Sequence, residues 1–456
     1  MVGVHSTNLA VVVFLLVVAA HGQRQKANAL ALSSNKAPGK IDDGVQGIHG
    51  DTSRGRFFAF RNRFLRVYML AVGADWLQSP FAYRLYKDTH KLPESTIAAL
   101  LATTAVCGGI SAPFVGSLAD RFGRRLACTS YCVIQSASCL TALLSCDLRL
   151  LFLGRVLGGV STVLLATAFE TWMLAESRRL GFAGSAELSS ILGEMSVAGG
   201  LVAVACGVIA EVSVNLFDSE KAPFVASVVC LVLAASLITG QWAENHGVSA
   251  GGGSKPGLPS QRAACSSPLV DPRLVAITLA TCAIEGSMYV VVHSWSRALN
   301  SSRSLPSDGG NPPLGILLAN FMSASALGSL CFTYIAQDGN SVQLSARAVQ
   351  VVLYVAGSSL LVVSLSQQES FRFWVFCIFG WCFGLYAPSV AYLKGRIIGD
   401  EHRGRAYALM RMPLSIVVAA VLGFLRGGDD YGDHVFMVCG GLVVATAVAM
   451  GKYVRT

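Results

Sequence analysis

The sequence predicts an all-α membrane protein with twelve transmembrane helices in two six-helix halves, preceded by a short hydrophobic segment. Of the 456 residues, 53% are hydrophobic and 13% are charged, whereas roughly 25% are charged in an ordinary soluble domain. Apolar stretches of about 20 residues, the length that crosses a bilayer as a helix, recur along the whole chain. The longest polar connection, residues 243–271, has six of these stretches on either side.

The twelve stretches define two halves of similar length. They centre near residues 75, 106, 136, 160, 200, 231, 283, 325, 355, 383, 415 and 444. We therefore expect an N-terminal half over residues 64–242 and a C-terminal half over residues 272–456. The connection 243–271 is rich in Gly, Ser and Pro, a composition typical of a flexible linker.

A further apolar segment, Leu9–Ala20, lies within the N-terminal region 1–63. Residues 1–8 contain no Lys or Arg, whereas basic residues follow the segment. This asymmetry favours a short extra span whose N-terminus lies outside, followed by a basic cytoplasmic linker. A cleaved signal peptide and an organellar transit peptide are the alternatives, since small residues end the segment and acidic residues are scarce.

Charge placement predicts the orientation of the core in the membrane. The chain carries 35 Lys and Arg against 26 Asp and Glu, a formal net charge of +9. The basic residues concentrate in alternate connections, so these connections are expected on the cytoplasmic side, with both ends of the core. The same clustering indicates membrane orientation and not nucleic-acid binding.

Soluble catalytic and metal-binding patterns are absent from the sequence. The thirteen Cys residues are scattered singly through apolar stretches, without zinc-ligand spacing. No polar segment contains a phosphate-binding Gly loop or a nucleophile elbow. We therefore expect no metal, no cofactor and no enzymatic activity.

A turn rich in Gly and Arg, with the sequence GSLADRFGRR over residues 116–125, joins the second and third stretches. Gly123 allows a tight turn there. The Asp120 carboxylate can face a helix N-terminus or pair with an Arg in one conformation and release it in another. Alternatively, the Arg residues only anchor the topology. The candidate gating residues are Gly116, Asp120, Arg121, Gly123, Arg124 and Arg125.

This turn resembles the signature of the major facilitator superfamily, which has twelve spans in two six-helix halves. The fourth stretch contains LGRVLGG over residues 153–159, which resembles a second signature of that superfamily. Its small residues let another helix approach closely.

Longer phrases resemble the eukaryotic molybdate-anion transporter family. They are ADWLQSPFAYRLY at 74–86, AFETW at 168–172, PLGI at 313–316 and RMPL at 411–414. The resemblance covers the chain from about residue 64 onward, and an N-terminal apolar segment is also a feature of that family. It implies uptake of the molybdate oxyanion and a location in the plasma membrane. We expect the chain to be monomeric. An organellar membrane is the alternative location.

Ionisable residues inside spans are costly and therefore functional candidates. Asp75 and Glu285 lie near mid-membrane in the equivalent first and seventh spans, while Arg155 and Arg411 lie in the fourth and eleventh. We hypothesise proton coupling, in which Asp75 or Glu285 takes up a proton as the anion binds. Arg155 or Arg411 would then contact the oxyanion through the guanidinium fork. Structural ion pairs are the alternative for both Arg residues.

Other charged and polar residues are secondary candidates. Glu170 and Glu194 are expected near the cytoplasmic end, as gate or topology residues. Tyr289 and His293 follow Glu285 at intervals of four and share its helix face. His293 could relay protons, although a His near a helix end is more often satisfied locally. Arg84 is expected in a solvated basic loop.

A secondary active transporter for molybdate or a similar tetrahedral oxyanion is therefore the leading interpretation, with protons and the lipid bilayer as its other partners. A transporter of another small solute, such as a sulfate-like anion or an organic solute, is the nearest alternative. A non-transporting receptor or scaffold with the same fold is the alternative of another class. Costly charges at mid-membrane favour transport over a scaffold.

Overall fold

The computed structural model describes most of the core of the chain. The described residues are 46–144, 146–181, 185–245, 272–301, 313–336, 342–366, 368–397, 413–414, 416–418, 420 and 432–453. The segment Leu9–Ala20, most of the linker 243–271 and Arg411 lie outside this part, as do the side chains of Asp120 and His293.

The described residues are almost entirely helical. The first group of helices comprises α2 (Gln46–Gln78), α4 (Glu94–Phe122), α5 (Arg124–Leu144), α6 (Leu148–Arg179), α7 (Ser185–Phe217) and α8 (Ala222–Gln241). The second group comprises α9 (Pro272–Ser301), α10 (Leu314–Ala336), α11 (Val342–Leu365), α12 (Glu369–Ile397) and α14 (Gly432–Tyr453). Within this part of the chain, ten helices are long and apolar enough to cross a membrane.

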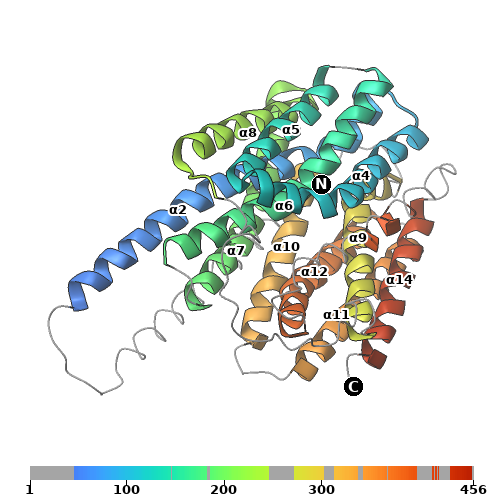
Figure 1. The fold of residues 1–456 in the computed structure, drawn as a ribbon. Coiled ribbons are helices and arrows are strands. Elements are labelled where there is room, and N and C mark those ends of the chain that lie inside the picture. The colour runs from blue at the N-terminus through green and yellow to red at the C-terminus, as the bar shows by residue number, and fades with distance from the viewer. Residues whose placement is uncertain are drawn as a thin grey trace.

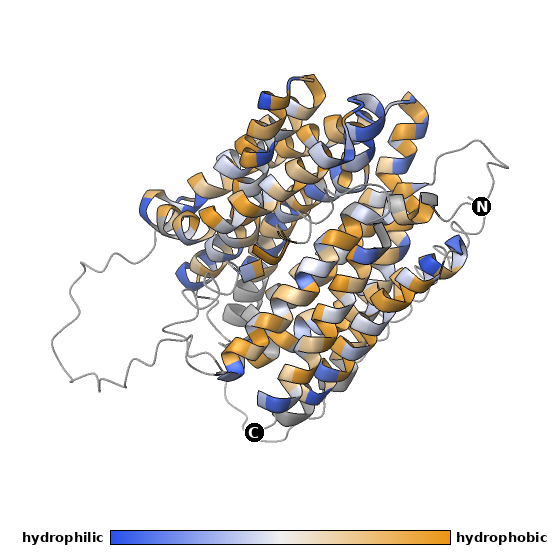
Figure 2. Cartoon of the chain, turned by 90° about the vertical axis from the view of Figure 1, so that its right-hand side faces the viewer, coloured by the Kyte–Doolittle hydropathy of each residue, from blue (hydrophilic) through white to orange (hydrophobic). Residues whose placement is uncertain are grey.

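These ten helices confirm ten of the predicted stretches, and the first stretch lies in α2. Apolar residues run along the helices and polar residues gather near their ends (Figure 2). The eleventh stretch falls largely outside the described residues. Helix α2 begins at Gln46, well before the expected start near residue 64. Residues 46–63 contain no proline, so every residue of this extension keeps a backbone N–H that the helix can use.

The α-helical geometry of α2 stops at Pro80, which has no backbone N–H to donate. The chain continues as a 3-10 turn η1 (Ser79–Phe81), a short helix α3 (Ala82–Arg84) and a π-helical turn η2 (Leu85–Thr89). The Ser79 hydroxyl donates a hydrogen bond of 2.9 Å to the carbonyl oxygen of Asp75. The break therefore lies one helical turn beyond a candidate residue.

The two groups form separate bundles that lie against each other (Figure 1). In the first, α2 packs on α7 and α8, and α6 packs on α4 and α5. In the second, α11 packs on α12 and α14, while α10 packs on α12. The groups meet along α7 and α10, and where η1 contacts α9 and α10.

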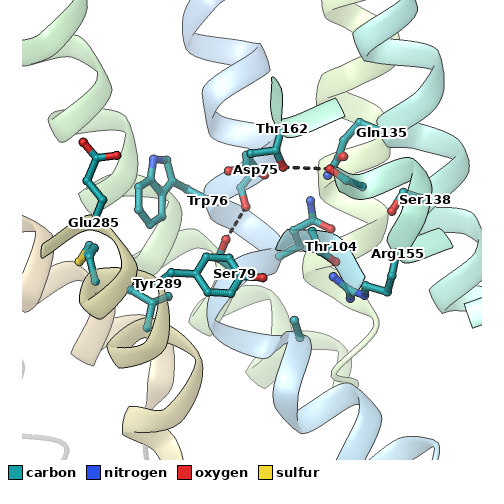
Figure 3. A pocket seen from close by; sticks show the side chains of 15 residues that line it. Asp75, Trp76, Ser79, Thr104, Gln135, Ser138, Arg155, Thr162, Glu285 and Tyr289 are labelled. Atoms are coloured by element: carbon teal, nitrogen blue, oxygen red, sulfur yellow. Dashed lines mark hydrogen bonds between the residues drawn. The ribbon is translucent and has the colours of Figure 1, made fainter. Parts of the chain in front are cut away.

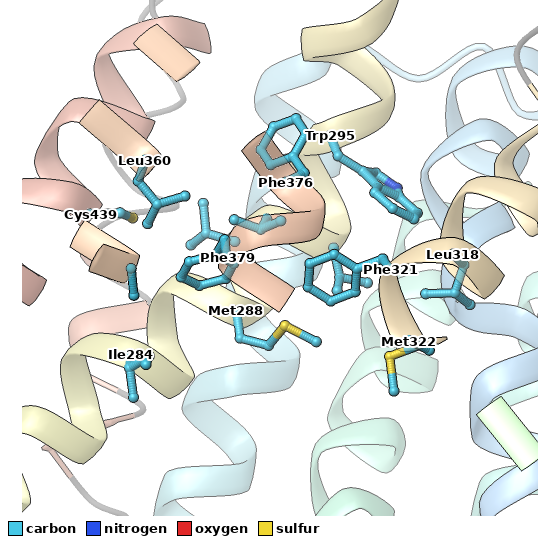
Figure 4. Close-up of a cluster of buried hydrophobic side chains, with 14 of the residues drawn as sticks. Ile284, Met288, Trp295, Leu318, Phe321, Met322, Leu360, Phe376, Phe379 and Cys439 are labelled. Carbon is cyan, nitrogen blue, oxygen red and sulfur yellow. The ribbon is translucent and has the colours of Figure 1, made fainter. Parts of the chain in front are cut away.

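We name the two ends of the molecule after residues that lie there. The Arg84 end holds the connections around residues 79–93, 146–147 and 218–221, and the Arg124 end holds the turn at Gly123 and residues 242–245. One buried apolar cluster contains residues of both groups, among them Phe81 and Leu101 with Ile284 and Trp295, and its first-group residues lie toward the Arg84 end. Figure 4 shows some of its second-group residues.

A second buried cluster lies toward the Arg124 end and contains only residues of the first group. It is built around stacked aromatic rings, with the ring centroids of Trp172 and Trp242 3.7 Å apart. In the described part of the chain, apolar contact between the groups is therefore concentrated toward the Arg84 end.

Candidate functional site

A cavity of about 260 Å³ lies between the two groups of helices (Figure 3). Six elements of the first half, α2, η1, α3, α4, α5 and α6, and helix α9 of the second group contribute to its wall. The lining residues are Asp75, Trp76, Gln78, Ser79, Ala82, Thr104, Gln135, Ser138, Arg155, Gly158, Thr162, Glu285, Met288, Tyr289 and Val292. Four of the predicted candidates, Asp75, Arg155, Glu285 and Tyr289, therefore share one cavity.

Arg155 reaches the cavity from α6 and is held by Tyr86. The Tyr86 hydroxyl oxygen accepts a hydrogen bond of 2.8 Å from the Arg155 Nε and a second bond from its Nη2. The guanidinium carbon also lies 4.8 Å from the centroid of the Tyr86 ring. Among the described residues, no carboxylate lies within ion-pair distance of Arg155. The Arg155 side chain is thus held in place by an uncharged group, the Tyr86 hydroxyl.

The glycines around Arg155 let α6 approach its neighbours. A Cβ on Gly158 would lie 3.1 Å from the Ser138 Oγ of α5, and one on Gly159 would lie 2.8 Å from the backbone nitrogen of Gly108 in α4. This finding confirms the close helix approach expected from the small residues. It fixes Arg155 between α4 and α5, beside the neutral groups of Gln135, Ser138 and Thr162.

Asp75 lies on α2 one turn before the break and is half-buried. Its carbonyl oxygen accepts the Ser79 hydroxyl, whereas no described group donates a hydrogen bond to its carboxylate. The carboxylate therefore borders the cavity without a fixed partner in the described part of the chain.

Glu285 and Tyr289 enter the cavity from α9, on the side opposite Gln135 and Arg155 (Figure 3). Their spacing of four residues places both on one helix face, as predicted. The Tyr289 hydroxyl donates a hydrogen bond of 3.3 Å to the carbonyl oxygen of Leu101 in α4. Tyr289 thus joins the two groups directly at the cavity.

Two other candidates, Glu194 and Glu170, do not line the cavity. Glu194 forms an ion pair with Arg61, with 3.1 Å between Oε1 and Nη1. Glu170 is exposed on α6 and does not line the cavity. Arg411 lies outside the described residues.

The turn at Gly123 has the geometry that the motif predicted. Gly123 has φ +115°, in the region that favours glycine, and its N–H donates to the Ala119 carbonyl oxygen at 3.0 Å. The Glu244 carboxylate accepts the N–H groups of Arg125 at 2.8 Å and Leu126 at 3.2 Å, and so caps α5. Glu244 was expected to belong to the flexible linker, and no local pattern predicts this contact.

The basic residues of this turn bind backbone carbonyls within the first group. Arg124 donates to the carbonyl oxygen of Thr171 at 3.2 Å, and Arg125 donates to that of Thr239 at 2.7 Å. Arg121 and Gly116 are exposed. The described contacts anchor the turn to α6 and α8, and a gating role stays a prediction.

Arg84 differs from the sequence expectation, because it is buried rather than solvated. Only 7% of its surface is exposed. Its guanidinium forms an ion pair with Glu220 in the α7–α8 connection and lies 3.7 Å from the Asp88 carboxylate. A partner far along the chain made this burial unpredictable from the local sequence.

Known proteins resemble the chain in sequence. A family model described as sugar transporters with twelve transmembrane spans matches residues 41–381. The molybdate-anion transporter of Takifugu rubripes is 30% identical over 430 residues, covering 86% of this chain and 87% of the relative. That of Danio rerio is 29% identical over 433 residues, with the same coverage of both chains.

Solved structures resemble the chain in fold. A peptide transporter of the POT family has a TM-score of 0.69 at 9% identity, covering 87% of this chain and 97% of the other. The xylose transporter XylE from E. coli, in an inward-open conformation, has a TM-score of 0.63 at 13% identity, covering 87% and 96%. At these identities the likeness concerns the fold alone.

Proposed function

The chain belongs to the family of twelve-span transporters of the major facilitator superfamily that includes the molybdate-anion transporters, and on this premise we propose that it carries molybdate across a membrane. The direction proposed is uptake. The name of the relatives supports the substrate, and the contents of the cavity support a small anion.

The observation that carries this proposal is the anchoring of Arg155 by Tyr86. A buried Arg that is neutralised by a carboxylate would offer an anion little net attraction, whereas Arg155 keeps its full charge beside the cavity. Its planar fork suits the oxygens of a tetrahedral oxyanion. Gln135, Ser138 and Thr162 add neutral polar groups to the same wall.

The volume of the cavity is compatible with such a substrate. One water molecule occupies about 30 Å³ in the liquid. A cavity of about 260 Å³ therefore has room for a tetrahedral oxyanion with part of its hydration shell. Larger organic solutes would need the cavity to widen.

Proton coupling is proposed from the charge balance of the cavity. Asp75 and Glu285 bring two carboxylates against one Arg among the described lining residues. A dianion would meet repulsion unless at least one carboxylate takes up a proton, and that requirement links the two binding events. We assign this role to Asp75 or Glu285.

Alternating access is proposed from the distribution of contacts between the groups. The apolar cluster closes the Arg84 end, whereas the cluster of the Arg124 end belongs to one group only. Relative rocking of two such bundles around a midplane site is the usual transport cycle of this architecture. We place the protein in the plasma membrane as a monomer, with the Arg124 end facing the cytoplasm.

The decisive experiment is molybdenum uptake, measured by elemental mass spectrometry at nanomolar molybdate in cells that lack their own transporter. Wild type, Arg155→Ala and Arg149→Ala are compared at matched surface expression. Arg149 is exposed on the same helix and does not line the cavity, so it controls for the loss of an Arg as such.

We expect uptake by wild type and Arg149→Ala, little reduced by excess sulfate, and loss of uptake in Arg155→Ala. Absence of uptake by a correctly localised wild type would favour transport of another solute, or a receptor function without transport. Normal uptake by Arg155→Ala would remove Arg155 from the site.

A further inference from the structure

A buried carboxylate joins the two groups at the Arg84 end. The Glu211 Oε2 on α7 accepts a hydrogen bond of 2.8 Å from the backbone N–H of Gly315 on α10. Glu211 is 8% exposed. Gly315 is the second residue of α10, and N–H groups in the first turn of a helix have no partner within that helix. A side chain of one group therefore caps a helix of the other.

Close backbone packing makes this contact possible. Gly207 lies four residues before Glu211 and so on the same face of α7. A Cβ on Gly315 would overlap the Gly207 carbonyl oxygen and come within 2.8 Å of the Glu211 Cβ. Because neither glycine has a side chain, α7 and α10 touch and the carboxylate reaches the helix end.

The described charged groups around Glu211 belong to its own group. Arg84 and Glu220 form an ion pair beside it, and both interact electrostatically with the Glu211 carboxylate. Asp88 lies next to Arg84. The Arg84–Glu220 pair can therefore stay intact when the two groups separate, whereas the bond between Glu211 and Gly315 cannot.

We propose that Glu211 is the latch of the gate at the Arg84 end. Its bond to the Gly315 amide stabilises the arrangement in which the cavity is closed at that end, and the bond breaks whenever that end opens. A charge-assisted hydrogen bond of this kind shifts the ratio of closed to open molecules by about tenfold or more. The latch acts on the conformation and is independent of which solute the cavity binds.

The test measures the width of the Arg84 end directly in purified full-length protein. Spin labels are placed on Leu216→Cys and Leu365→Cys, which are 73% and 78% exposed at the ends of α7 and α11. The exposed Cys146 is replaced by Ser to limit background labelling. Pulsed electron resonance then gives the distribution of distances between the labels, without any substrate.

We expect Glu211→Ala to add or enlarge a population with a longer distance than wild type shows. Glu211→Gln keeps the size and one acceptor oxygen but loses the charge, so it should shift the distribution in the same direction by less. Gly315→Ala inserts a methyl group between the helices and should also lengthen the distance.

Glu220→Gln is the matched control, since it removes a carboxylate at the same end that pairs within the first group. Its distribution should remain that of wild type. An unchanged distribution in Glu211→Ala and Glu211→Gln would overturn the latch, as would an equal shift in Glu220→Gln. Because no molybdate is used, a failure of the substrate assignment would leave this result unaffected.

Discussion

The hydroxyl of Tyr86 accepts two N–H groups of the Arg155 guanidinium, although the two residues are 69 positions apart in the chain. Tyr86 is 1% exposed and lies in the π-helical turn that follows the break in α2. The irregular segment after Pro80 thus supplies the group that orients the cavity's arginine. Irregular helices in membrane proteins are tolerated where they border such cavities.

Loss of the Tyr86 hydroxyl should weaken molybdate binding. Tyr86→Phe keeps the ring beneath the guanidinium but leaves two N–H groups without their acceptor, which costs about 1–3 kcal/mol. We expect KM for molybdate uptake to rise on the order of tenfold, with surface expression unchanged. Kinetics of uptake at varied molybdate measure this effect.

Tyr83→Phe is the control for that variant. The Tyr83 hydroxyl donates to Glu94 at 2.6 Å and does not line the cavity. Its removal should leave KM near the wild-type value. Equal effects of the two substitutions would show that Tyr86 acts on the fold of the segment and not on Arg155.

Replacement of the coupling carboxylate should make uptake insensitive to the proton gradient. In Asp75→Asn or Glu285→Gln the cavity already has the charge that protonation would give it, so the anion no longer requires a proton to bind. One of the two variants should take up molybdate at a rate that a protonophore does not change. Wild-type sensitivity to the protonophore in both variants would exclude these carboxylates from coupling.

Two glycines of the same motif should respond oppositely to alanine. At Gly123 the positive φ strains any other residue by about 1–3 kcal/mol, and the new Cβ would lie 2.5 Å from the Cδ of Glu244. At Gly116 nothing lies within 4 Å of the new Cβ, and alanine favours the helix. Thermal unfolding in detergent should therefore show a lower unfolding temperature for Gly123→Ala and an equal or higher one for Gly116→Ala. A stable Gly123→Ala would contradict the strained turn.

Removal of Arg84 should destabilise the protein more at neutral pH than at acidic pH. Burial, opposed by the Arg84 guanidinium, holds the pKa of the Glu220 carboxyl above its ordinary value. The folded state therefore binds this proton more tightly than the unfolded state, and stability falls as pH rises through the two pKa values. Arg84→Ala removes the opposing charge and enlarges this fall.

Unfolding temperatures of wild type and Arg84→Ala, measured across pH values from 5 to about 8, test whether the destabilisation grows as the pH rises. The double variant Arg84→Ala with Glu220→Gln has no carboxyl to titrate at this position, so it should lose the added pH dependence. A single variant that is equally destabilised at every pH would assign the effect to packing alone.

Local patterns were sufficient to predict the helices and the turn. The length of an apolar stretch predicts a membrane-spanning helix, and a glycine permits a tight turn, without any contact from distant parts of the chain. Ten predicted spans coincide with helices, and Gly123 adopts the turn that its motif indicates. Asp75, Arg155 and Glu285, which stand out in the sequence as charges within apolar spans, line one cavity. Their roles in binding and coupling remain proposals.

What the sequence did not reveal depends on distant partners. In the sequence Tyr86 has no feature that distinguishes it from a packing residue. Its contact with Arg155 depends on the packing of α6 against the segment after Pro80. Glu211 lies near the end of an apolar stretch, and its partner is a backbone amide of the other group. Glu244 follows the last apolar residue of its half and has no local mark of a helix cap. Each of these contacts requires the packed arrangement of helices.

The early start of α2 has a mechanical consequence. A helix of 33 residues is about 50 Å long, while the apolar layer of a bilayer is about 30 Å thick. Only the part of this rod after residue 63 belongs to the first apolar stretch, so residues 46–63, about 27 Å of helix, precede it, and Figure 1 shows this end standing clear of the other helices. The rod belongs to the first group, so a few degrees of rocking about the α7–α10 contact would swing its tip through a much longer arc than any residue beside the cavity. If the bundles rock as proposed for alternating access, small rotations at the cavity thus become large displacements of this end of α2.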